Sequence, residues 1–263
     1  MLLFRAIVPD FMFEMDKWQG RNAMITGANS GIGAAVTRKL LKLGLNVIGI
    51  DKNTDMLQEM KDDIKSAGEL YPRSVELQNE EEIMETFRWT EETLGGVDVM
   101  INCAGVGGRA SLLDGTVDEW KKLMDVNVIA LSICTKEAID SMRKRNVDGH
   151  IIHLSSFTAH HVPNFAPLHF YCATKHAVRA LTEGLRQELK AINSPIKVTC
   201  LSPGLVKSAI FKSSLGYDFD EFLYSSRPCI QPEDVASTIE FVLSTPPHVQ
   251  IQDIIVKPLG SDV

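Results

Sequence analysis

A tyrosine and a lysine, Tyr171 and Lys175, frame the segment Tyr171-Cys172-Ala173-Thr174-Lys175. On a helix this spacing puts both side chains on one face. A free tyrosine has a pKa of about 10, and a neighbouring ammonium group favours the phenolate and lowers that pKa. The pair therefore suits general acid–base chemistry with Tyr171 as the proton carrier, although the same spacing also occurs in ordinary helices. We expect Cys172 to be a buried helix thiol.

Polar and small residues follow several short β-branched runs of the chain. Ser155-Ser156 end one run, the Asn-Cys-Ala-Gly segment 102–105 ends another, and Pro203-Gly204 follow a third. Asn127 lies near the start of a helix expected to run beside the sheet. Because open parallel sheets bind ligands at the carboxyl ends of their strands, these residues are predicted to share one site with Tyr171.

A glycine-rich turn, Thr26-Gly27-Ala28-Asn29-Ser30-Gly31-Ile32-Gly33, joins the first expected strand to the first helix. Glycines let the backbone approach a pyrophosphate closely, and a helix N-terminus offers free N–H groups with partial positive charge. The turn alone is also compatible with a tight strand–helix connection. Its position after the first strand favours a dinucleotide site.

Asp51 ends the second expected strand, 18 residues after Gly33. A carboxylate at this position accepts hydrogen bonds from an adenosine ribose and repels a 2′-phosphate, which favours NAD. Lys52 is the next residue, and its charge could pair with a 2′-phosphate, so NADP remains the alternative.

Strand-like and helix-like segments alternate along the chain, which is typical of a parallel sheet covered on both faces. With right-handed crossovers, this predicts an α/β fold with a doubly wound, Rossmann-type, seven-stranded parallel sheet. We expect one domain over residues 16–263, preceded by an apolar extension over 1–15 that packs on the surface or attaches peripherally to a membrane. The expected strands are 23–26, 45–50, 74–77, 97–102, 150–155, 197–201 and 249–255; the helices are 31–43, 55–67, 80–94, 117–124, 126–145, 170–191 and 232–243, with 205–229 irregular.

Composition narrows the partners of the 263-residue chain. Its 27 basic and 34 acidic residues give a net charge of −7. The sequence has no cluster of Lys and Arg, so we do not expect a nucleic-acid partner. Five isolated cysteines favour a reducing compartment, so we expect a cytoplasmic location. Pro9 and Asp10 interrupt the apolar N-terminal run, and no window reaches membrane-spanning length. The histidines between 150 and 176 lack zinc-type spacing, so no metal is expected.

Taken together, these motifs resemble the short-chain dehydrogenase/reductase family over about residues 17–257. Residues 170–175 running into 180–189, the His160-His161-Val162 loop and the tail 243–250 are similar to its farnesol dehydrogenase-like branch. Cys103 and Ser208 depart from the family's usual Asn and Thr, and Glu76 stands where an Asp is usual. Asp51 also departs from that branch, which usually carries a cation there.

The resemblance implies a catalytic tetrad of Asn127, Ser156, Tyr171 and Lys175. Tyr171 would exchange a proton with the substrate oxygen, Ser156 would hold that oxygen, and Lys175 would lower the tyrosine pKa. Asn127 would anchor a water that relays protons to Lys175. The residues assigned to cofactor binding are Gly27, Asn29, Ser30, Gly31, Ile32, Gly33, Asp51, Lys52, Glu76, Leu77, Asn102, Ala104, Gly105, Tyr171, Lys175, Pro203, Gly204, Val206 and Ser208.

The expected reaction is hydride transfer between a nicotinamide cofactor, NAD in preference to NADP, and a lipophilic alcohol such as farnesol, a hydroxysteroid or retinol. An NADP-linked carbonyl reductase is the main alternative, followed by a nucleotide-sensing or lipid-binding protein without turnover. By resemblance, the long helices at 126–145 and 170–191 would form a homodimer or homotetramer interface. Apolar residues that recur along the loops would line the substrate wall: Phe157, Val162, Phe165, Leu168, Ile210, Phe211, Leu215, Phe219, Phe222 and Leu223.

Overall fold

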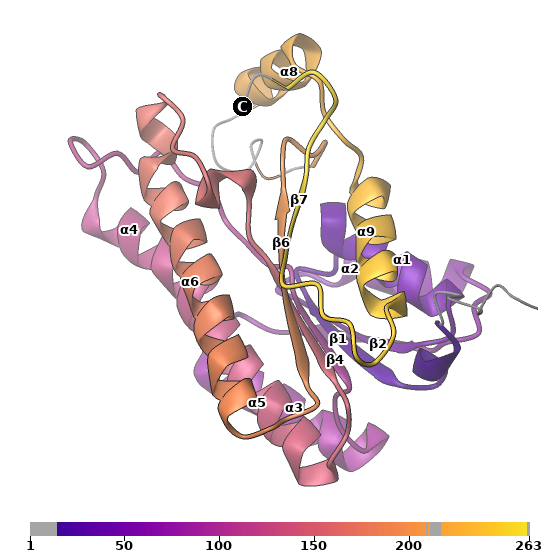
Figure 1. Ribbon diagram of the computed structural model, residues 1–263. Helices are drawn as coiled ribbons and strands as arrows, with labels where there is room; N and C mark the ends of the chain where they lie inside the picture. The colour runs from indigo at the N-terminus through magenta and orange to yellow at the C-terminus, as the bar shows by residue number, and fades with distance from the viewer. Residues whose placement is uncertain (1–14, 209, 211–216, 262–263) are drawn as a thin grey trace, which may run out of the picture.

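A seven-stranded parallel sheet forms the centre of the computed structural model, which describes residues 15–208, 210 and 217–261 (Figure 1). The strand order is β3-β2-β1-β4-β5-β6-β7, and every pairing is parallel. This confirms the predicted fold class. The strands are β1 (Asn22–Thr26), β2 (Asn46–Asp51), β3 (Leu70–Ser74), β4 (Val99–Asn102), β5 (His150–Leu154), β6 (Lys197–Pro203) and β7 (Asp253–Val256).

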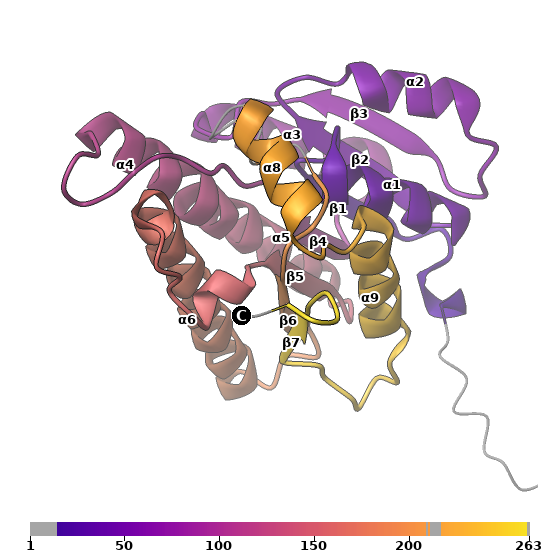
Figure 2. The ribbon, with the colours of Figure 1, turned by 90° about the horizontal axis from the view of Figure 1, so that it is seen from above.

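Helices cover both faces of the sheet. Helices α1, α2 and α9 pack on one face, and α3, α5 and α6 pack on the other. Helix α8 lies over the carboxyl ends of the strands (Figures 1 and 2). The helix bounds are α1 (Gly31–Lys42), α2 (Asp55–Asp63), α3 (Glu80–Leu94), α4 (Val117–Met124), α5 (Leu131–Arg145), α6 (His169–Ala191), α8 (Tyr217–Ser226) and α9 (Pro232–Ser244), with short helices η1 (Asp16–Trp18), η2 (Asp125–Ala130), η3 (Phe157–Ala159) and η4 (Ala166–Leu168).

Two apolar cores result from the alternation of side chains along each strand. Ile25 of β1 faces the layer of α1 and α9, whereas its neighbour Met24 faces the layer of α3 and α5. Both side chains are fully buried. This two-sided burial explains the continuously hydrophobic strands of the sequence.

The third strand differs from the prediction. It spans Leu70–Ser74 and not 74–77, and it pairs in register from Val47 with Leu70 to Asp51 with Ser74. Pro72 argues against a strand in the sequence, because proline has no backbone N–H to donate to a neighbouring strand. At the edge of a sheet, where β3 lies, one side of the strand has no partner strand and tolerates proline.

Several other predicted boundaries are wrong. Residues 217–226 form helix α8, although the segment 205–229 was predicted to be irregular. Phe219, Phe222 and Leu223 have the spacing of a helix, but we interpreted them as apolar residues of a loop that lines the substrate site. The last strand spans Asp253–Val256 instead of 249–255, and the second helix ends at Asp63 instead of residue 67.

The N-terminal prediction concerns mainly residues outside the described part of the chain. Of the expected extension 1–15, only Met15 is described, and it packs against the core formed with α1 and α9. Among the described residues, no helix has both the length and the apolar character required to cross a membrane.

A buried histidine, His153 of β5, links the sheet to two helices through directed hydrogen bonds. The Thr182 hydroxyl donates to the Val178 carbonyl at 2.8 Å, so it accepts the Nδ1–H of His153 at 2.8 Å. The Thr135 hydroxyl then donates to Nε2 at 2.9 Å and accepts from the Asn102 amide at 3.0 Å. Only a neutral imidazole satisfies this chain, and burial lowers the pKa of His153 to about 3.

This histidine makes folding sensitive to acid. Between pH 6.5, the pKa of an exposed histidine, and about pH 3, the unfolded chain binds a proton at His153 that the folded chain does not bind. The free energy of unfolding therefore decreases by about 1.4 kcal/mol per pH unit as the pH falls through this window. Urea titrations at a series of pH values give the unfolding free energy as a function of pH. For His153→Gln we expect this free energy to change with pH by about 1.4 kcal/mol less per pH unit than in the wild type, and to be lower than the wild-type value at pH 8. The exposed His161→Gln is the control, and equal slopes for all three proteins would contradict the assignment.

Candidate active site

The carboxyl ends of β1 and β4 are tied together by one side chain. The Thr26 hydroxyl accepts the backbone N–H groups of Cys103 and Ala104, both at 3.1 Å. The strand order reverses between these two strands, since β2 and β3 lie on one side and β5 to β7 on the other. This is the switch point at which open α/β sheets bind their ligands.

The glycine turn after β1 leaves no space for side chains. Gly27 has φ +69°, and a Cβ there would lie 2.8 Å from Ala104 Cα. A Cβ on Gly33 would lie 2.0 Å from the Gly27 carbonyl oxygen. Helix α1 then begins after Ser30 without a side-chain cap or an acidic residue in its first turn. Its first N–H groups are therefore suited to bind an anion such as a phosphate.

Asp51 lies next to this turn at the end of β2. One of its carboxylate oxygens accepts the backbone N–H of Asn29 at 3.2 Å, and Asn29 Oδ1 accepts the N–H of Leu57 in α2 at 3.1 Å. Asp51 is partly exposed and Lys52 is exposed. Glu76 and Leu77 follow β3 in a turn at the same edge of the sheet.

Lys175 of α6 is buried at the end of β5. Its Nζ donates to the Leu154 carbonyl at 2.8 Å and lies 5.7 Å from the centroid of the Tyr171 ring. Burial lowers the pKa of Lys175 to about 8, because a low-dielectric environment disfavours the ammonium form. A Cβ on Gly105 would lie 3.6 Å from Nζ, which is ordinary van der Waals contact, so Gly105 lies directly beside the ammonium group.

Asn127 lies beside the same glycine, 3.5 Å from the Cβ that Gly105 lacks. It belongs to the π-helical turn η2, which interrupts the continuous helix predicted over 126–145. Its Oδ1 accepts the N–H of Val106 at 2.8 Å, and its Nδ2 donates to the Val106 carbonyl and to Thr174. The side-chain amide therefore fixes the segment after β4, and it is engaged with protein groups on both sides.

Tyr171 and Ser156 line a cavity of about 120 Å³ at the ends of β5 and β6. Burial raises the pKa of Tyr171, and a hydrogen bond with Ser156 opposes this effect. We predicted that Lys175, aided by a cationic nicotinamide, lowers the tyrosine pKa. In the protein alone burial outweighs every favourable contact, so the phenol keeps its proton at neutral pH.

The predicted substrate wall is only partly found around this cavity. Phe157, Leu168 and Ile210 line it, whereas Val162 and Phe222 are exposed to solvent. Phe211, Leu215 and the side chain of Phe219 lie outside the described residues. Ser155, predicted to share the site with Tyr171, lines the cavity as well. Our sequence reasoning missed three further lining residues, namely Gly107, Thr158 and Leu205.

Several of the predicted cofactor residues line the cavity. Ile32, Pro203, Gly204, Val206 and Ser208 line the same cavity as Tyr171. Asn102 is buried at the end of β4, and its Oδ1 is a buried acceptor without a hydrogen-bond partner among the described protein groups.

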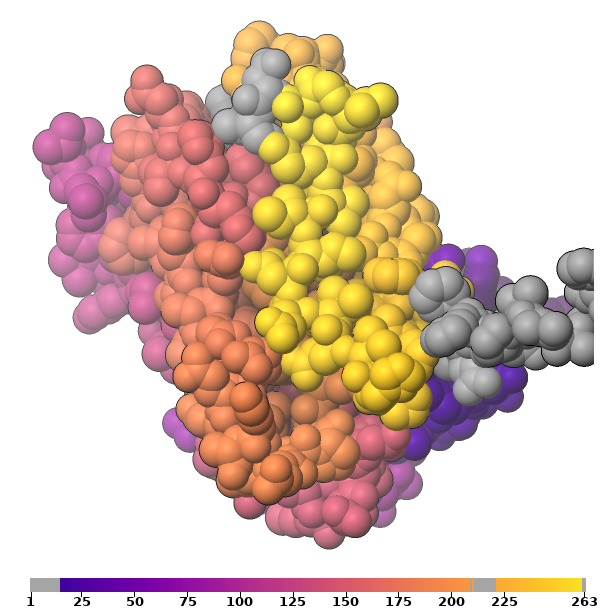
Figure 3. Space-filling model, in the orientation of Figure 1, coloured from indigo at the N-terminus to yellow at the C-terminus, as the bar shows by residue number. Residues whose placement is uncertain are grey.

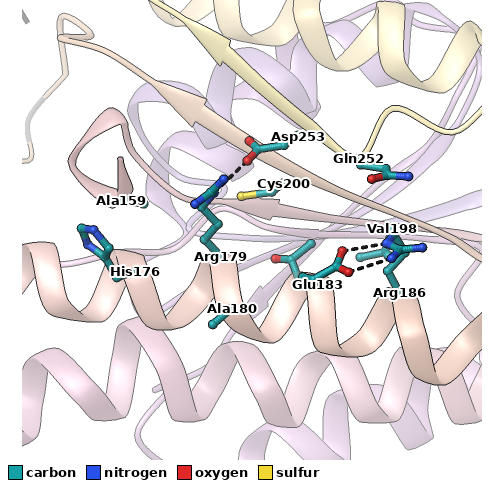
Figure 4. A pocket seen from close by; sticks show the side chains of 11 residues that line it. Ala159, His176, Arg179, Ala180, Glu183, Arg186, Val198, Cys200, Gln252 and Asp253 are labelled. Atoms are coloured by element: carbon teal, nitrogen blue, oxygen red, sulfur yellow. Dashed lines mark hydrogen bonds and ion pairs between the residues drawn. The ribbon is translucent and has the colours of Figure 1, made fainter. Parts of the chain in front are cut away.

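A larger hollow of about 640 Å³ lies elsewhere, between α6 and the segment that leads into β7 (Figure 4). Its charges are paired internally, with Arg179 on Asp253 at 2.9 Å and Arg186 on Glu183 at 2.7 Å. The space-filling view shows α6 in orange beside the yellow C-terminal segment on this face (Figure 3). Neither Tyr171 nor Ser156 lines this hollow, so the smaller cavity is the candidate active site.

The described part of the chain contains no cluster of side chains that could bind a metal ion. No group of three or more His, Cys, Asp or Glu side chains there is arranged to hold a metal ion.

The switch-point turn and the tyrosine beside a buried lysine define an NAD(P)-dependent oxidoreductase. Residues 21–216 match the short chain dehydrogenase family, and the protein belongs to the short-chain dehydrogenase/reductase family. It is 47% identical over 250 residues to dehydrogenase/reductase SDR family member 11 of Bos taurus, covering 93% of this chain and 98% of the relative. It is 37% identical over 249 residues to farnesol dehydrogenase of Aedes aegypti, covering 94% and 99%.

A solved structure supports the same assignment. The closed form of serine dehydrogenase complexed with NADP+ superimposes with a TM-score of 0.83 at 27% identity, covering 92% of this chain and 96% of that one. The protein is thus an NAD(P)-dependent short-chain dehydrogenase/reductase related to the farnesol dehydrogenase-like branch. Its glycine turn and uncapped α1 fit a dinucleotide pyrophosphate.

Two glycine-to-alanine variants test whether the glycine turn between β1 and α1 binds the dinucleotide. Gly33→Ala places a Cβ against the Gly27 carbonyl, so we expect a loss of about 1–3 kcal/mol in stability and at least tenfold weaker dinucleotide binding. Gly184 of α6 has no atom within 4 Å of an added Cβ, so Gly184→Ala should be neutral or stabilise by up to about 1 kcal/mol. Thermal unfolding and isothermal titration measure both. Wild-type binding by Gly33→Ala would contradict this account of the turn.

Proposed function

We propose that this enzyme oxidises lipophilic alcohols with NAD. The observation that supports this function best is the pairing of the partly buried Tyr171 with the buried Ser156, which line a mainly apolar cavity beside Lys175. The side chains of Phe157, Leu168 and Ile210 give that cavity its apolar character. Farnesol, hydroxysteroids and retinol are the substrate classes to test, and the 37% identity to farnesol dehydrogenase supports the first of them.

In the proposed mechanism, Tyr171 exchanges a proton with the substrate oxygen. Ser156 donates a hydrogen bond to that oxygen and stabilises the charge that develops on it. Lys175 is buried near the phenol, where its ammonium stabilises negative charge on the ring. Asn127 holds the Val106 segment against Lys175. In this proposal it also anchors a water that relays protons to Lys175. An oxidised nicotinamide would supply the hydride acceptor, and its ring would carry a positive charge before the transfer.

The protonated phenol also suits the reverse reaction. Burial keeps the proton on Tyr171, so the group is ready to act as an acid toward a carbonyl oxygen. NADP-linked carbonyl reduction is therefore the second candidate function. It is also supported by the serine dehydrogenase structure, which contains NADP+.

We propose NAD as the cofactor because of Asp51. Its carboxylate is fixed by the Asn29 N–H beside the glycine turn, where it would accept hydrogen bonds from the adenosine ribose. A 2′-phosphate at that place would meet this negative charge, and Lys52 is the cation that could offset it. We propose that all the residues assigned to cofactor binding from the sequence contact the bound dinucleotide.

The test is nicotinamide absorbance turnover with farnesol, a hydroxysteroid and retinol, each with NAD and NADP. We expect NAD-linked turnover, reduced at least about 100-fold in Tyr171→Phe, because the phenol is the acid–base group. Dinucleotide binding by Tyr171→Phe should persist, since the substitution keeps the ring.

The possible results separate the candidates. Turnover only with NADP would show that Lys52 outweighs Asp51. Binding of a dinucleotide without turnover of any of these alcohols or their carbonyl forms would favour a sensing or lipid-binding role. Full activity in Tyr171→Phe would contradict the mechanism.

We also propose that residues 16–263 form one domain that assembles as a homodimer or homotetramer. A groove of about 490 Å³ lies between α5 and α6, and its apolar residues include Leu181 and Ile192, which are 42% and 54% exposed. Such a face gains free energy when a second copy covers it. The five free cysteines support a reducing compartment such as the cytoplasm.

Sedimentation at micromolar concentration tests the interface. We expect the wild type to sediment as an oligomer and Leu181→Glu to shift it toward monomer, because the change buries a charge in the contact. Leu113→Glu alters a leucine that is 94% exposed outside this groove, so it should leave the assembly unchanged. A monomeric wild type would rule out the proposal.

A further inference from the structure

The phenol of Tyr224 contacts the backbone of the segment that follows β6. Tyr224 lies on α8, and its hydroxyl oxygen lies 2.8 Å from the Val206 carbonyl and 2.9 Å from the Ser208 carbonyl. The N–H of Ser208 donates to the same oxygen at 3.1 Å. One phenol therefore serves three backbone groups that are 16 to 18 positions away in the sequence.

The chemistry of a phenol matches this arrangement. A tyrosine hydroxyl has one hydrogen to donate, shared here between two carbonyls, and a lone pair that accepts an N–H. Ser208 is partly buried and Val206 is 6% exposed, so these backbone groups have limited access to water. Removing the hydroxyl while keeping the ring would leave buried backbone groups without this partner, which costs more than the mean value of a hydrogen bond.

A second attachment holds the start of the same segment. The N–H of Lys207 donates to the Ile230 carbonyl, and the N–H of Ile230 donates to the Leu205 carbonyl, both at 2.9 Å. This bridge reaches as far as Lys207, and the Tyr224 phenol extends the attachment to Ser208. We therefore expect the loss of the Tyr224 hydroxyl to affect the position of Ser208 more than that of Leu205.

Ser208 lies against the glycine turn. A Cβ on Gly31, the first residue of α1, would lie 3.2 Å from Ser208 Cβ. Ser208 and Val206 also line the cavity that contains Tyr171 and Ile32. The position of Ser208 thus sets the separation between the segment after β6 and the N-terminus of α1, where the pyrophosphate is proposed to bind.

We infer that Tyr224 is a positioning residue for the dinucleotide: its phenol holds Ser208 at the distance from α1 that the cofactor requires. The inference rests on the proposed function and deepens it, because it assigns part of the cofactor affinity to a residue outside the cavity. Tyr224 acts through the backbone and not on the reacting atoms, so it should affect binding of the cofactor and not the chemical step.

The experiment compares wild type, Tyr224→Phe and a matched control, Tyr71→Phe. Tyr71 lies on β3 at the opposite edge of the sheet, and its hydroxyl donates to Glu69 at 2.8 Å on an exposed surface. For Tyr224→Phe we expect the Kd for NAD+, measured by isothermal titration without substrate, to rise about five- to tenfold. The KM for the cofactor should rise in parallel, while kcat at saturating cofactor stays within about twofold. Tyr71→Phe should match the wild type.

Other outcomes separate this inference from the proposed function. Unchanged Kd and KM in Tyr224→Phe would overturn the inference and leave the dehydrogenase assignment intact. A parallel loss of kcat and melting temperature would also overturn it, because it would indicate a purely structural role. A wild type that binds a dinucleotide without turning over alcohols would refute the proposed function, while the Kd comparison would still test Tyr224. A wild type that binds neither NAD+ nor NADP+ would refute both.

Discussion

Burial of the Lys175 ammonium at the end of β5 is the constraint on which the arrangement of the site depends. A buried cation is costly unless hydrogen bonds replace its water, and the Leu154 carbonyl supplies one at 2.8 Å. That carbonyl is available because β5 ends there and the chain turns away into η3. With a pKa lowered to about 8, the amine is still mostly charged at neutral pH. Gly105 lies beside the ammonium group and beside Asn127.

The same burial determines the state of the neighbouring phenol. Tyr171 shares the helix face of Lys175, yet removal from water raises the tyrosine pKa and the hydrogen bond from Ser156 only partly compensates. Spacing along a helix thus predicted the contact, whereas the predicted lowering of the tyrosine pKa includes a cationic nicotinamide that the protein alone does not supply. The two groups are close, and in the protein alone desolvation is the largest influence on the tyrosine pKa.

Motifs that depend on local geometry were predictable from the sequence. The glycine turn, Asp51 at the end of β2 and the tyrosine–lysine helix lie where the alternation of strands and helices requires them. Pro72 and the aromatic period of α8 were misread because their meaning depends on tertiary position: an edge strand tolerates proline, and a helix over the sheet uses aromatic spacing that also suits a loop. The π-turn at Asn127 has no period of its own in the sequence. Tyr224 had no sequence signal, since its partners are backbone groups 16 and 18 positions away.

The central claim is that the protein alone keeps Tyr171 protonated, so that added positive charge is needed to release the proton. Ultraviolet difference titration of phenolate absorbance, with the Tyr171→Phe spectrum subtracted from the wild type, isolates this one tyrosine. Without any ligand, we expect no Tyr171 phenolate below about pH 10, the ordinary value for tyrosine. A Tyr171 phenolate that appears near pH 7 in the free protein would contradict the account, because it would mean that Lys175 outweighs burial.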